Sequence, residues 1–432
     1  MTEMAVLFGL LFLFIAMGME VPLALAASMF ATIVLVMPAI DPMIIALRAV
    51  GTMARAWPLL TIPMFIMLGE IFKLGKISAH IVDVANILVG RLPGGLAIVN
   101  IVTSFFFGGI SGSASADTSA IGGIMIPMMK KQGYSSTFST VVTITSSTLG
   151  PIVPPSVLMI LIGWVTGQSV GMLFLAGYVP GFATMFGLIA LSVVISVKRG
   201  YPRFPTPPFR EAIRIILGAL PVLLTPLIIV ASIVSGAVTI VESSVIALVW
   251  SILISVFWYR QLKWSNLFDI LRNTVATTAF VGLLLAFASA FAWLVTFSGL
   301  PREIAQILAT SNIGPTGFLM IAMVLFLFLG TFLNAGEIVL MAIPILYPAA
   351  LAMGIDPIHF CVIAALSMVI GNVTPPVGLC LFIGCAISGD RVEDLVRPLV
   401  PYVGVMVAVI VLLIFVPGIV LWLPEQFGYV SR

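Results

Sequence analysis

The stretch that decides the fold is "SSTLGPIVPPSVLMILIG", residues 146–163. It lies in a long apolar segment, yet a hydroxyl cluster, a Gly-Pro and a Pro-Pro pair interrupt what would otherwise be one membrane helix. Proline removes a helix donor and clashes with the preceding turn, so a helix is broken there. Irregular backbone at membrane depth is tolerated only when it is buried in protein or lines a wet cavity. The break therefore indicates a binding site inside a membrane protein.

The composition supports a membrane location. The chain has 432 residues, of which 61% are hydrophobic and 8% are charged, against about 25% charged residues in an average soluble domain. Ten or more apolar segments are long enough to span a bilayer, which predicts an all-α polytopic membrane protein. Candidate helices lie near residues 4–18, 20–38, 58–72, 137–164, 172–197, 215–234, 238–258, 273–298 and 400–423, and amphipathic interfacial pieces lie near 43–56 and 76–90.

Several classes of function are excluded or disfavoured. The net charge of +3 does not suggest nucleic acid as a partner, and the three cysteines have no metal spacing. The N-terminus carries Glu3 and no basic region, so the first apolar run is expected to be a retained span rather than a cleaved signal peptide. No Walker or HExxH motif occurs, which argues against direct ATP driving and against a zinc-dependent enzyme.

Basic residues cluster in two loops that should face the cytoplasm. One loop holds Lys198, Arg199, Arg203, Arg210 and Arg214, and the other holds Arg260, Lys263 and Arg272. The Pro-rich and Arg-rich segment 201–214 is interpreted as a cytoplasmic linker between a first half, 1–200, and a second half, 215–432.

The two halves contain an internal repeat. A constant offset of 221 residues relates Gly109 to Gly330, Ala114 to Ala335, Pro127 to Pro348, Gly133 to Gly354, Ser146 to Ser367, Gly150 to Gly371, Pro154 and Pro155 to Pro375 and Pro376, and Gly163 to Gly384. The odd number of crossings counted between the copies predicts that the second copy is inverted. Inverted repeats with interrupted helices at equivalent positions are typical of secondary transporters with a site at the membrane midplane.

Each half has one hairpin segment and one broken segment. The hairpins lie at about 94–130 and 315–353, and the broken helices at about 137–164 and 358–388. Their small polar residues and freed carbonyls supply the oxygens that a sodium ion needs, and half-helix N-termini favour an anionic substrate group. Close packing and a proline kink would explain one such segment equally well, but two pairs at one offset favour a site.

The acids near these motifs have two interpretations. Asp117 and Glu337 each follow a small-residue turn, so they either help to bind a cation or cap a hairpin helix, and capping is preferred for Asp117. Glu70 is interpreted as a residue outside the site, explained by a helix-end position or by pairing with a basic residue. No basic residue lies within the four motif segments that would contact a substrate carboxylate.

The motifs "SGSASADTSAIG", "SSTLGPIVPPS", "LNAGE" and "GNVTPPVGLCLF" resemble those of the large membrane subunit of tripartite ATP-independent periplasmic (TRAP) transporters, the DctM-like family. The resemblance covers essentially the whole chain. It implies an ion-transporter-superfamily fold with two re-entrant hairpins, two discontinuous helices, a scaffold and a moving transport domain. It also implies a sodium-driven elevator in the bacterial inner membrane that imports an organic anion, such as a C4-dicarboxylate, a sialic acid or another sugar or keto acid.

The resemblance also implies partners and sites. The partners would be a separate small membrane subunit, which is DctQ-like, and a periplasmic substrate-binding protein, which is DctP-like; the cofactors would be two or more sodium ions. One sodium site would use Ser111, Gly112, Ser113, Ser146, Ser147 and Gly150, and a second would use Gly330, Thr331, Asn334, Gly336, Gly371 and Thr374. The substrate would lie near Ser113, Ser115, Asn334, Pro154 and Pro375.

Three alternatives remain open from the sequence. A stand-alone sodium–carboxylate symporter would work without a binding protein or small subunit. A channel would conduct its substrate without coupling to sodium. An intramembrane enzyme would need a nucleophile–base pair or metal ligands at depth.

Overall fold

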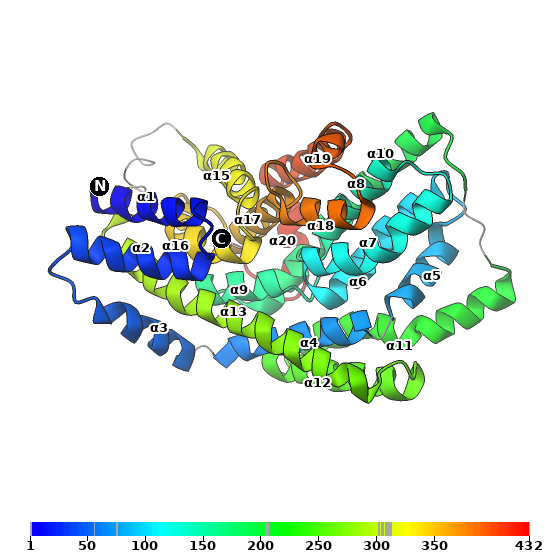
Figure 1. Ribbon diagram of the computed structural model, residues 1–432, viewed down its shortest axis with the longest axis horizontal. Coiled ribbons are helices and arrows are strands. Elements are labelled where there is room, and N and C mark those ends of the chain that lie inside the picture. Colours follow the sequence, from blue (N-terminus) through cyan, green and yellow to red (C-terminus); the bar gives the residue numbers. More distant parts are fainter. Residues whose placement is uncertain are drawn as a thin grey trace.

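The computed structural model describes residues 2–55, 57–74, 77–203, 207–300, 303, 306 and 313–431. Over these residues it is helical and contains no strand (Figure 1). Six of the described helices are long and apolar enough to cross a membrane. The remaining apolar helices are shorter, because glycine, proline or polar residues interrupt the longer apolar runs. The all-α architecture predicted from the sequence is confirmed.

The helices of the first half follow one another closely along the chain. They are α1 (Thr2–Ala16), α2 (Val21–Val36), α3 (Met43–Arg55), η1 (Trp57–Leu60), α4 (Thr61–Leu74), α5 (Ser78–Val89), α6 (Gly95–Ser111), α7 (Ala114–Lys131), α8 (Ser136–Ser146), η2 (Ser147–Leu149), α9 (Val157–Thr166) and α10 (Val170–Arg199).

The second half contains longer helices. They are α11 (Phe209–Val234), α12 (Ile240–Leu253), η3 (Ile254–Trp258), α13 (Trp264–Phe297), α15 (Pro315–Gly330), α16 (Ala335–Ala352), α17 (Pro357–Gly371), α18 (Leu379–Ser388), α19 (Val392–Phe415) and α20 (Gly418–Gln426).

Several predicted boundaries are wrong; α13, for example, begins at Trp264 rather than near residue 273. The expected helix 400–423 is divided, because α19 ends at Phe415 and α20 begins at Gly418. Pro417 disfavours a helical conformation at the residue before it, and Val416 has the non-helical angles φ −127° and ψ 74°. The linker 201–214 is also shorter than expected, since α11 begins at Phe209 and includes Arg210 and Arg214; residues 204–206 lie outside the described part.

Two groups of helices position the site. In the first, the long helix α13 packs against α2, α3 and α4, while α12 packs against α4 and α11; Figure 1 shows α13 running obliquely past α3 and α4. In the second, the hairpin α6–α7 packs on α8, the hairpin α15–α16 packs on α17, and α18 packs on α7 and α8. Contacts of α4 with α6 and of α13 with α16 join the groups.

The same order of helices occurs twice. Adding 221 to the bounds of α7 gives those of α16 residue for residue, and the breaks after α8 and α17 each contain a cis Pro-Pro bond, at Pro154-Pro155 and Pro375-Pro376. The repeat predicted from single residues therefore extends to whole helices. The inversion of one copy relative to the other stays a prediction.

Polar contacts connect the halves at the far ends of α7 and α18. Asp390 accepts hydrogen bonds from the hydroxyls of Ser136 and Thr140, both at 2.9 Å. Lys130 Nζ donates to the carbonyl of Ser388, also at 2.9 Å. Since these groups come from opposite halves, the second broken helix is held against the first hairpin.

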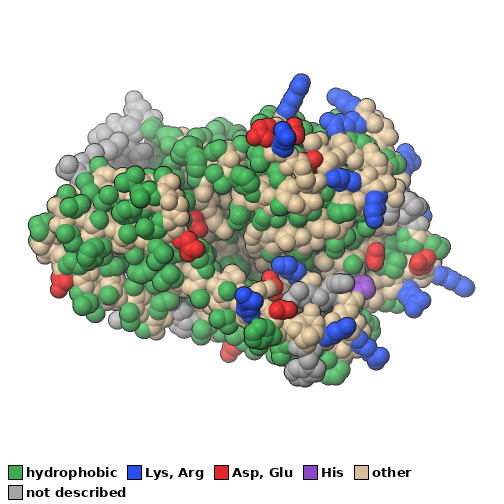
Figure 2. Space-filling view, viewed as in Figure 1, with side chains coloured by type: hydrophobic (Ala, Val, Ile, Leu, Met, Phe, Trp, Pro, Cys, Tyr) green, Lys and Arg blue, Asp and Glu red, His purple; other side chains and the backbone are tan. Residues whose placement is uncertain are grey.

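The surface is consistent with a bilayer environment. Figure 2 shows hydrophobic side chains over most of one face, with Lys and Arg side chains gathered toward the right-hand part of the view. Many large apolar side chains are exposed, including Leu35, Leu47, Phe186 and Phe257. Contiguous exposed apolar surface on this scale marks a membrane or protein interface rather than a water-facing one.

Candidate functional site

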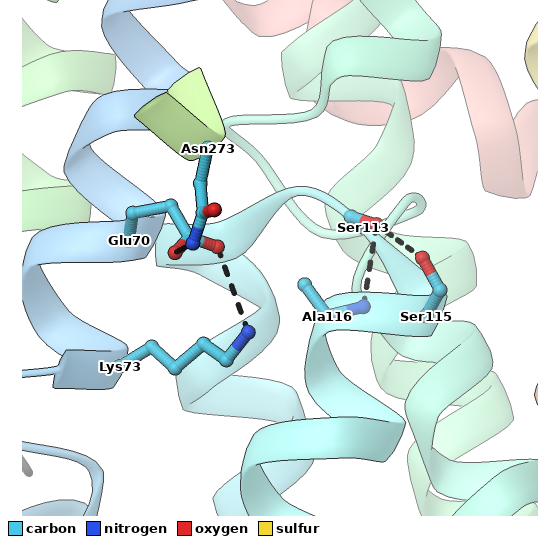
Figure 3. Close-up of polar contacts among 6 residues, drawn as sticks. All are labelled: Glu70, Lys73, Ser113, Ser115, Ala116 and Asn273. Carbon is cyan, nitrogen blue, oxygen red and sulfur yellow. Dashed lines mark hydrogen bonds and ion pairs between the residues drawn. The ribbon is translucent and has the colours of Figure 1, made fainter. Parts of the chain in front are cut away.

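The tip of the first hairpin is a tight turn between two helices. Gly112 ends α6 in the left-handed conformation, with φ 59°, which glycine adopts without a steric penalty. Ser113 then caps α7: its hydroxyl accepts from Ala116 N at 3.5 Å and shares a hydrogen bond with the Ser115 hydroxyl at 3.1 Å (Figure 3). A Cβ at Gly112 would lie 2.9 Å from the carbonyl oxygen of Pro155. The tip therefore rests directly on the first break.

The first break is a non-helical segment between η2 and α9. The hydroxyls of Ser146 and Ser147 donate to the carbonyl of Thr143 at 3.0 and 2.8 Å, so their oxygens keep lone pairs that can accept. The Ser113 carbonyl lies beside Gly150, where a Cβ would come within 3.3 Å of it. Backbone and hydroxyl oxygens of the tip and the break are thus brought together in a buried region.

The second hairpin tip meets the second break through backbone contacts. Gly378 N donates to the Thr331 carbonyl at 2.9 Å. The Asn372 amide, with its nitrogen facing the hairpin, donates to the carbonyls of Gly330 at 3.3 Å and Leu333 at 3.2 Å. Asn334 begins α16, and its N–H donates to Glu337 Oε2 at 3.1 Å. Glu337 therefore has the capping role that the sequence left open.

Both tips line one cavity with a volume of about 420 Å³. The first tip contributes residues 111–116, the second contributes residues 334–337, and α9 adds Val157, Leu158 and Leu161. Gly336 packs near Leu161, since a Cβ there would lie 3.5 Å from that side chain. Because residues of both halves surround the cavity, neither half forms it alone.

Four helices of the described chain begin at this cavity. The first residues of α7, α9, α16 and α18 all line it: Ala114 and Ser115, Val157 and Leu158, Ala335 and Gly336, and Leu379 and Cys380. Each helix N-terminus carries a partial positive charge, although some first-turn N–H groups are already bonded, such as Ala116 N to Ser113, Met159 N to Ser156 and Cys380 N to Asn372. Such ends bind anions, and four of them around one space make it suited to an anionic group.

The residues expected to bind substrate lie in different places. Ser113, Ser115 and Asn334 line the cavity, whereas Pro154 and Pro375 are not among its lining residues. The residues expected to bind sodium also divide into two sets. Ser111, Gly112, Ser113, Asn334 and Gly336 line the cavity, and Ser146, Ser147, Gly150, Gly330, Thr331, Gly371 and Thr374 lie outside its lining.

Three of those glycines, Gly150, Gly330 and Gly371, together with Gly108, permit close crossings of the backbone. A Cβ at Gly108 would lie 2.7 Å from Gly150 Cα, and a Cβ at Gly330 would lie 2.8 Å from Gly371 Cα. No side chain fits at these distances. In each half, one hairpin helix therefore crosses the broken helix at a glycine–glycine contact, which is a packing role that the sequence did not distinguish from ion binding.

Asp117 is a fully buried acid behind the first tip. It lies beside the hydroxyls of Ser104 and Ser147, but neither carboxylate oxygen has a hydrogen bond of standard geometry within the described chain. The capping role preferred for Asp117 is therefore not observed. A buried carboxylate without a partner is costly, and a nearby cation or proton would offset that cost.

Sequence reasoning missed several cavity-lining residues, among them Glu70, Lys73 and Asn372. The asparagine stands next to the glycine of "GNVTPP", so its amide could have been found from its place in the break. Glu70 and Lys73 lie on α4, outside every motif, and only the tertiary fold brings them to the site.

Comparison with known proteins agrees with this architecture. The family described as "Tripartite ATP-independent periplasmic transporter, DctM component" matches residues 8–419. The chain is 36% identical over 372 residues to the sialic acid TRAP transporter large permease protein SiaM of Vibrio cholerae, covering 86% of this chain and 87% of SiaM. It is 34% identical over 374 residues to the C4-dicarboxylate TRAP transporter large permease protein DctM of Pseudomonas aeruginosa, with 86% and 87% covered.

The fold is also similar to a solved structure. The crystal structure of the Alcanivorax borkumensis YdaH transporter superposes with a TM-score of 0.62 over 88% of each chain, at 14% sequence identity. At this identity the similarity concerns the fold alone. The family match over nearly the whole length, together with the two large permeases, shows that this chain belongs to the DctM family of TRAP transporter large permeases and is a multi-pass protein of the bacterial inner membrane.

Proposed function

We propose that the chain imports an organic anion by secondary active transport coupled to sodium. The observation that carries this proposal is the convergence of four helix N-termini on one cavity of about 420 Å³. Hydroxyls of Ser113 and Ser115 and the amide of Asn334 add neutral donors to the same space. Positive helix ends with neutral donors suit an acid group and hydroxyl-bearing carbon atoms.

Sodium coupling is supported by the two junctions between a tip and a break. Each junction gathers carbonyls and hydroxyls whose protons are already donated to helix carbonyls; examples are Ser147 to Thr143 and Thr374 to Ile370, both at 2.8 Å. Oxygen ligands without free protons suit a hard cation. The Asp117 carboxyl group lies behind the first junction without a hydrogen bond of standard geometry, and it would add negative charge there when ionised.

An elevator mechanism is consistent with the two groups of helices. The hairpins and broken helices would form the moving transport domain, and α4, α12 and α13 would belong to the scaffold. A small membrane subunit would complete the scaffold, and a periplasmic binding protein would deliver the substrate. The relatives named for sialic acid and C4-dicarboxylate transport make these two acids the first candidates.

Uptake into proteoliposomes tests the proposal. The permease, reconstituted with its small subunit and binding protein, should accumulate labelled sialic acid or succinate when an inward sodium gradient is imposed. A potassium gradient of equal ionic strength should give no accumulation, and an imposed proton gradient without sodium should not replace it. Accumulation driven by protons alone would refute sodium coupling, and uptake that needs no binding protein would favour a stand-alone symporter.

A further inference from the structure

One wall of the cavity comes from α4 and α13 rather than from the hairpins. α4 contributes Gly69, Glu70 and Lys73, and α13 contributes Thr277, Phe280, Val281 and Leu284. Among the described lining residues, Lys73 is the single cationic side chain. The wall therefore has one full positive charge, paired with the Glu70 carboxylate 3.6 Å away, next to helix ends that carry only partial charges.

The contacts of Lys73 hold it in place without using up its donors. Its Nζ lies 3.6 Å from Glu70 Oε1, which is an ion-pair distance but too long for a hydrogen bond. The other carboxylate oxygen of Glu70 accepts from Asn273 Nδ2 of α13 at 3.0 Å (Figure 3). Asn273 thus fixes Glu70, and Glu70 keeps the ammonium near the cavity.

The two charged side chains differ in their exposure to solvent. The Lys73 side chain is 41% exposed and the Glu70 side chain is 19% exposed. A solvated ion pair between two residues of one helix contributes little to stability. Stabilisation of α4 therefore does not explain why Asn273, on another helix, donates to Glu70. An arrangement of acid, orienting amide and accessible ammonium at a cavity wall is instead suited to binding an anion.

We propose that Lys73 binds the acid group of the transported anion and that Glu70, oriented by Asn273, is its positioning residue. This inference rests on the proposed function and specifies the ligand: a compact carboxylate or similar acid group at the α4 side of the cavity. The remainder of the molecule would extend toward Ser113 and Asn334 on the hairpin tips. The ammonium has three donors, so it can contact the ligand while it stays near Glu70.

Measuring anion binding to the permease itself tests the inference. The periplasmic binding protein is left out, because its own affinity for the anion would otherwise dominate an uptake measurement. The full-length permease, purified with its small subunit in saturating sodium, is titrated with sialic acid or succinate at constant ionic strength, and thermal unfolding is followed. We expect Lys73→Ala to weaken the apparent affinity about tenfold or more. Lys73→Arg should retain affinity within about threefold, because it keeps the charge.

Further variants separate binding from structure. Asn273→Ala, which releases Glu70 without removing a charge, should weaken affinity less than Lys73→Ala does, and both variants should unfold as the wild type does without anion. Lys131→Ala is the matched control, since Lys131 is an exposed lysine of α7 outside the cavity. The neutral diamide of succinate should stabilise wild type and Lys73→Ala equally little.

The outcomes distinguish the two proposals. If wild type binds either acid and Lys73→Ala binds it with unchanged affinity, this inference is overturned while the proposed function stands. If neither acid stabilises the wild type and neither is taken up by the reconstituted complex, both acids named for this site are wrong, and the assignment of Lys73 fails with them.

Discussion

Gly108→Ala should push the first hairpin away from the first broken helix. A Cβ at this position would lie 2.7 Å from Gly150 Cα and 3.0 Å from Gly150 N. The obstructing atoms are backbone, so they cannot rotate aside, and the helices must separate by about 0.7 Å to restore ordinary contact. Overpacking of this kind costs about 1–3 kcal/mol, while alanine in a helix interior gains up to about 1 kcal/mol over glycine.

Gly404→Ala is the control for the stability that alanine gains over glycine in a helix. Gly404 is also inside a helix, α19, but a Cβ there would meet nothing within 4 Å. Gly404→Ala should therefore be as stable as wild type or slightly more stable, and Gly108→Ala should be less stable than Gly404→Ala by about 1–3 kcal/mol. The free energy of unfolding can be compared by SDS titration in mixed micelles, with helix content measured by circular dichroism.

The same substitution should also affect the cavity, because Gly112 and Ser113 follow α6 directly and would move with it. Anion-induced thermal stabilisation should be reduced in Gly108→Ala and unchanged in Gly404→Ala. Equal unfolding free energies for the two variants, with wild-type anion affinity in both, would show that the crossing at Gly150 is not tight, and the packing argument would be refuted.

Five other substitutions have defined expectations. Ser113→Ala and Asn334→Ala should lower anion uptake without loss of folded protein by size-exclusion chromatography; unchanged uptake in both would remove them from the substrate site. Asp117→Asn should shrink the sodium-specific rise in melting temperature relative to choline, and an undiminished rise would show that its charge is not coupled to the ion. Asp390→Ala should cost about 1–3 kcal/mol, because it leaves the Ser136 hydroxyl without its acceptor, although Thr140 can still donate to the Ser136 carbonyl; a loss below about 0.5 kcal/mol would contradict this. Tyr429→Phe should cost about 1 kcal/mol by removing a donor to the N-cap carboxylate of α17, and unchanged unfolding would show that this contact is dispensable.

The motif segments could be predicted from the sequence, because glycine and proline act on the backbone locally. The hairpin and break elements follow from proline and glycine positions, and the offset of 221 places α16 from α7 exactly to the residue. The interruption of the last predicted helix is not evident from hydropathy, because residues 400–423 form one apolar run and only Pro417 marks the break.

The wall of the cavity could not be predicted. Glu70 and Lys73 precede the first tip by about 40 residues and Asn273 follows it by about 160, and no pattern in the sequence connects them. Their association depends on how α4 and α13 pack against the hairpins. Glu70 consequently resembled an ordinary helix-end acid until the fold placed it beside the cavity.

The repeat has a consequence for how a ligand is oriented. The four helix ends at the cavity form two equivalent pairs, α7 with α16 and α9 with α18, so on their own they would attract an acid group equally from either half. Lys73 breaks this equivalence, since the position 221 residues later is Leu294, which is buried and uncharged. The charge distribution of the cavity is therefore asymmetric, although its two halves are similar. A molecule with a single acid group would bind there in one preferred orientation.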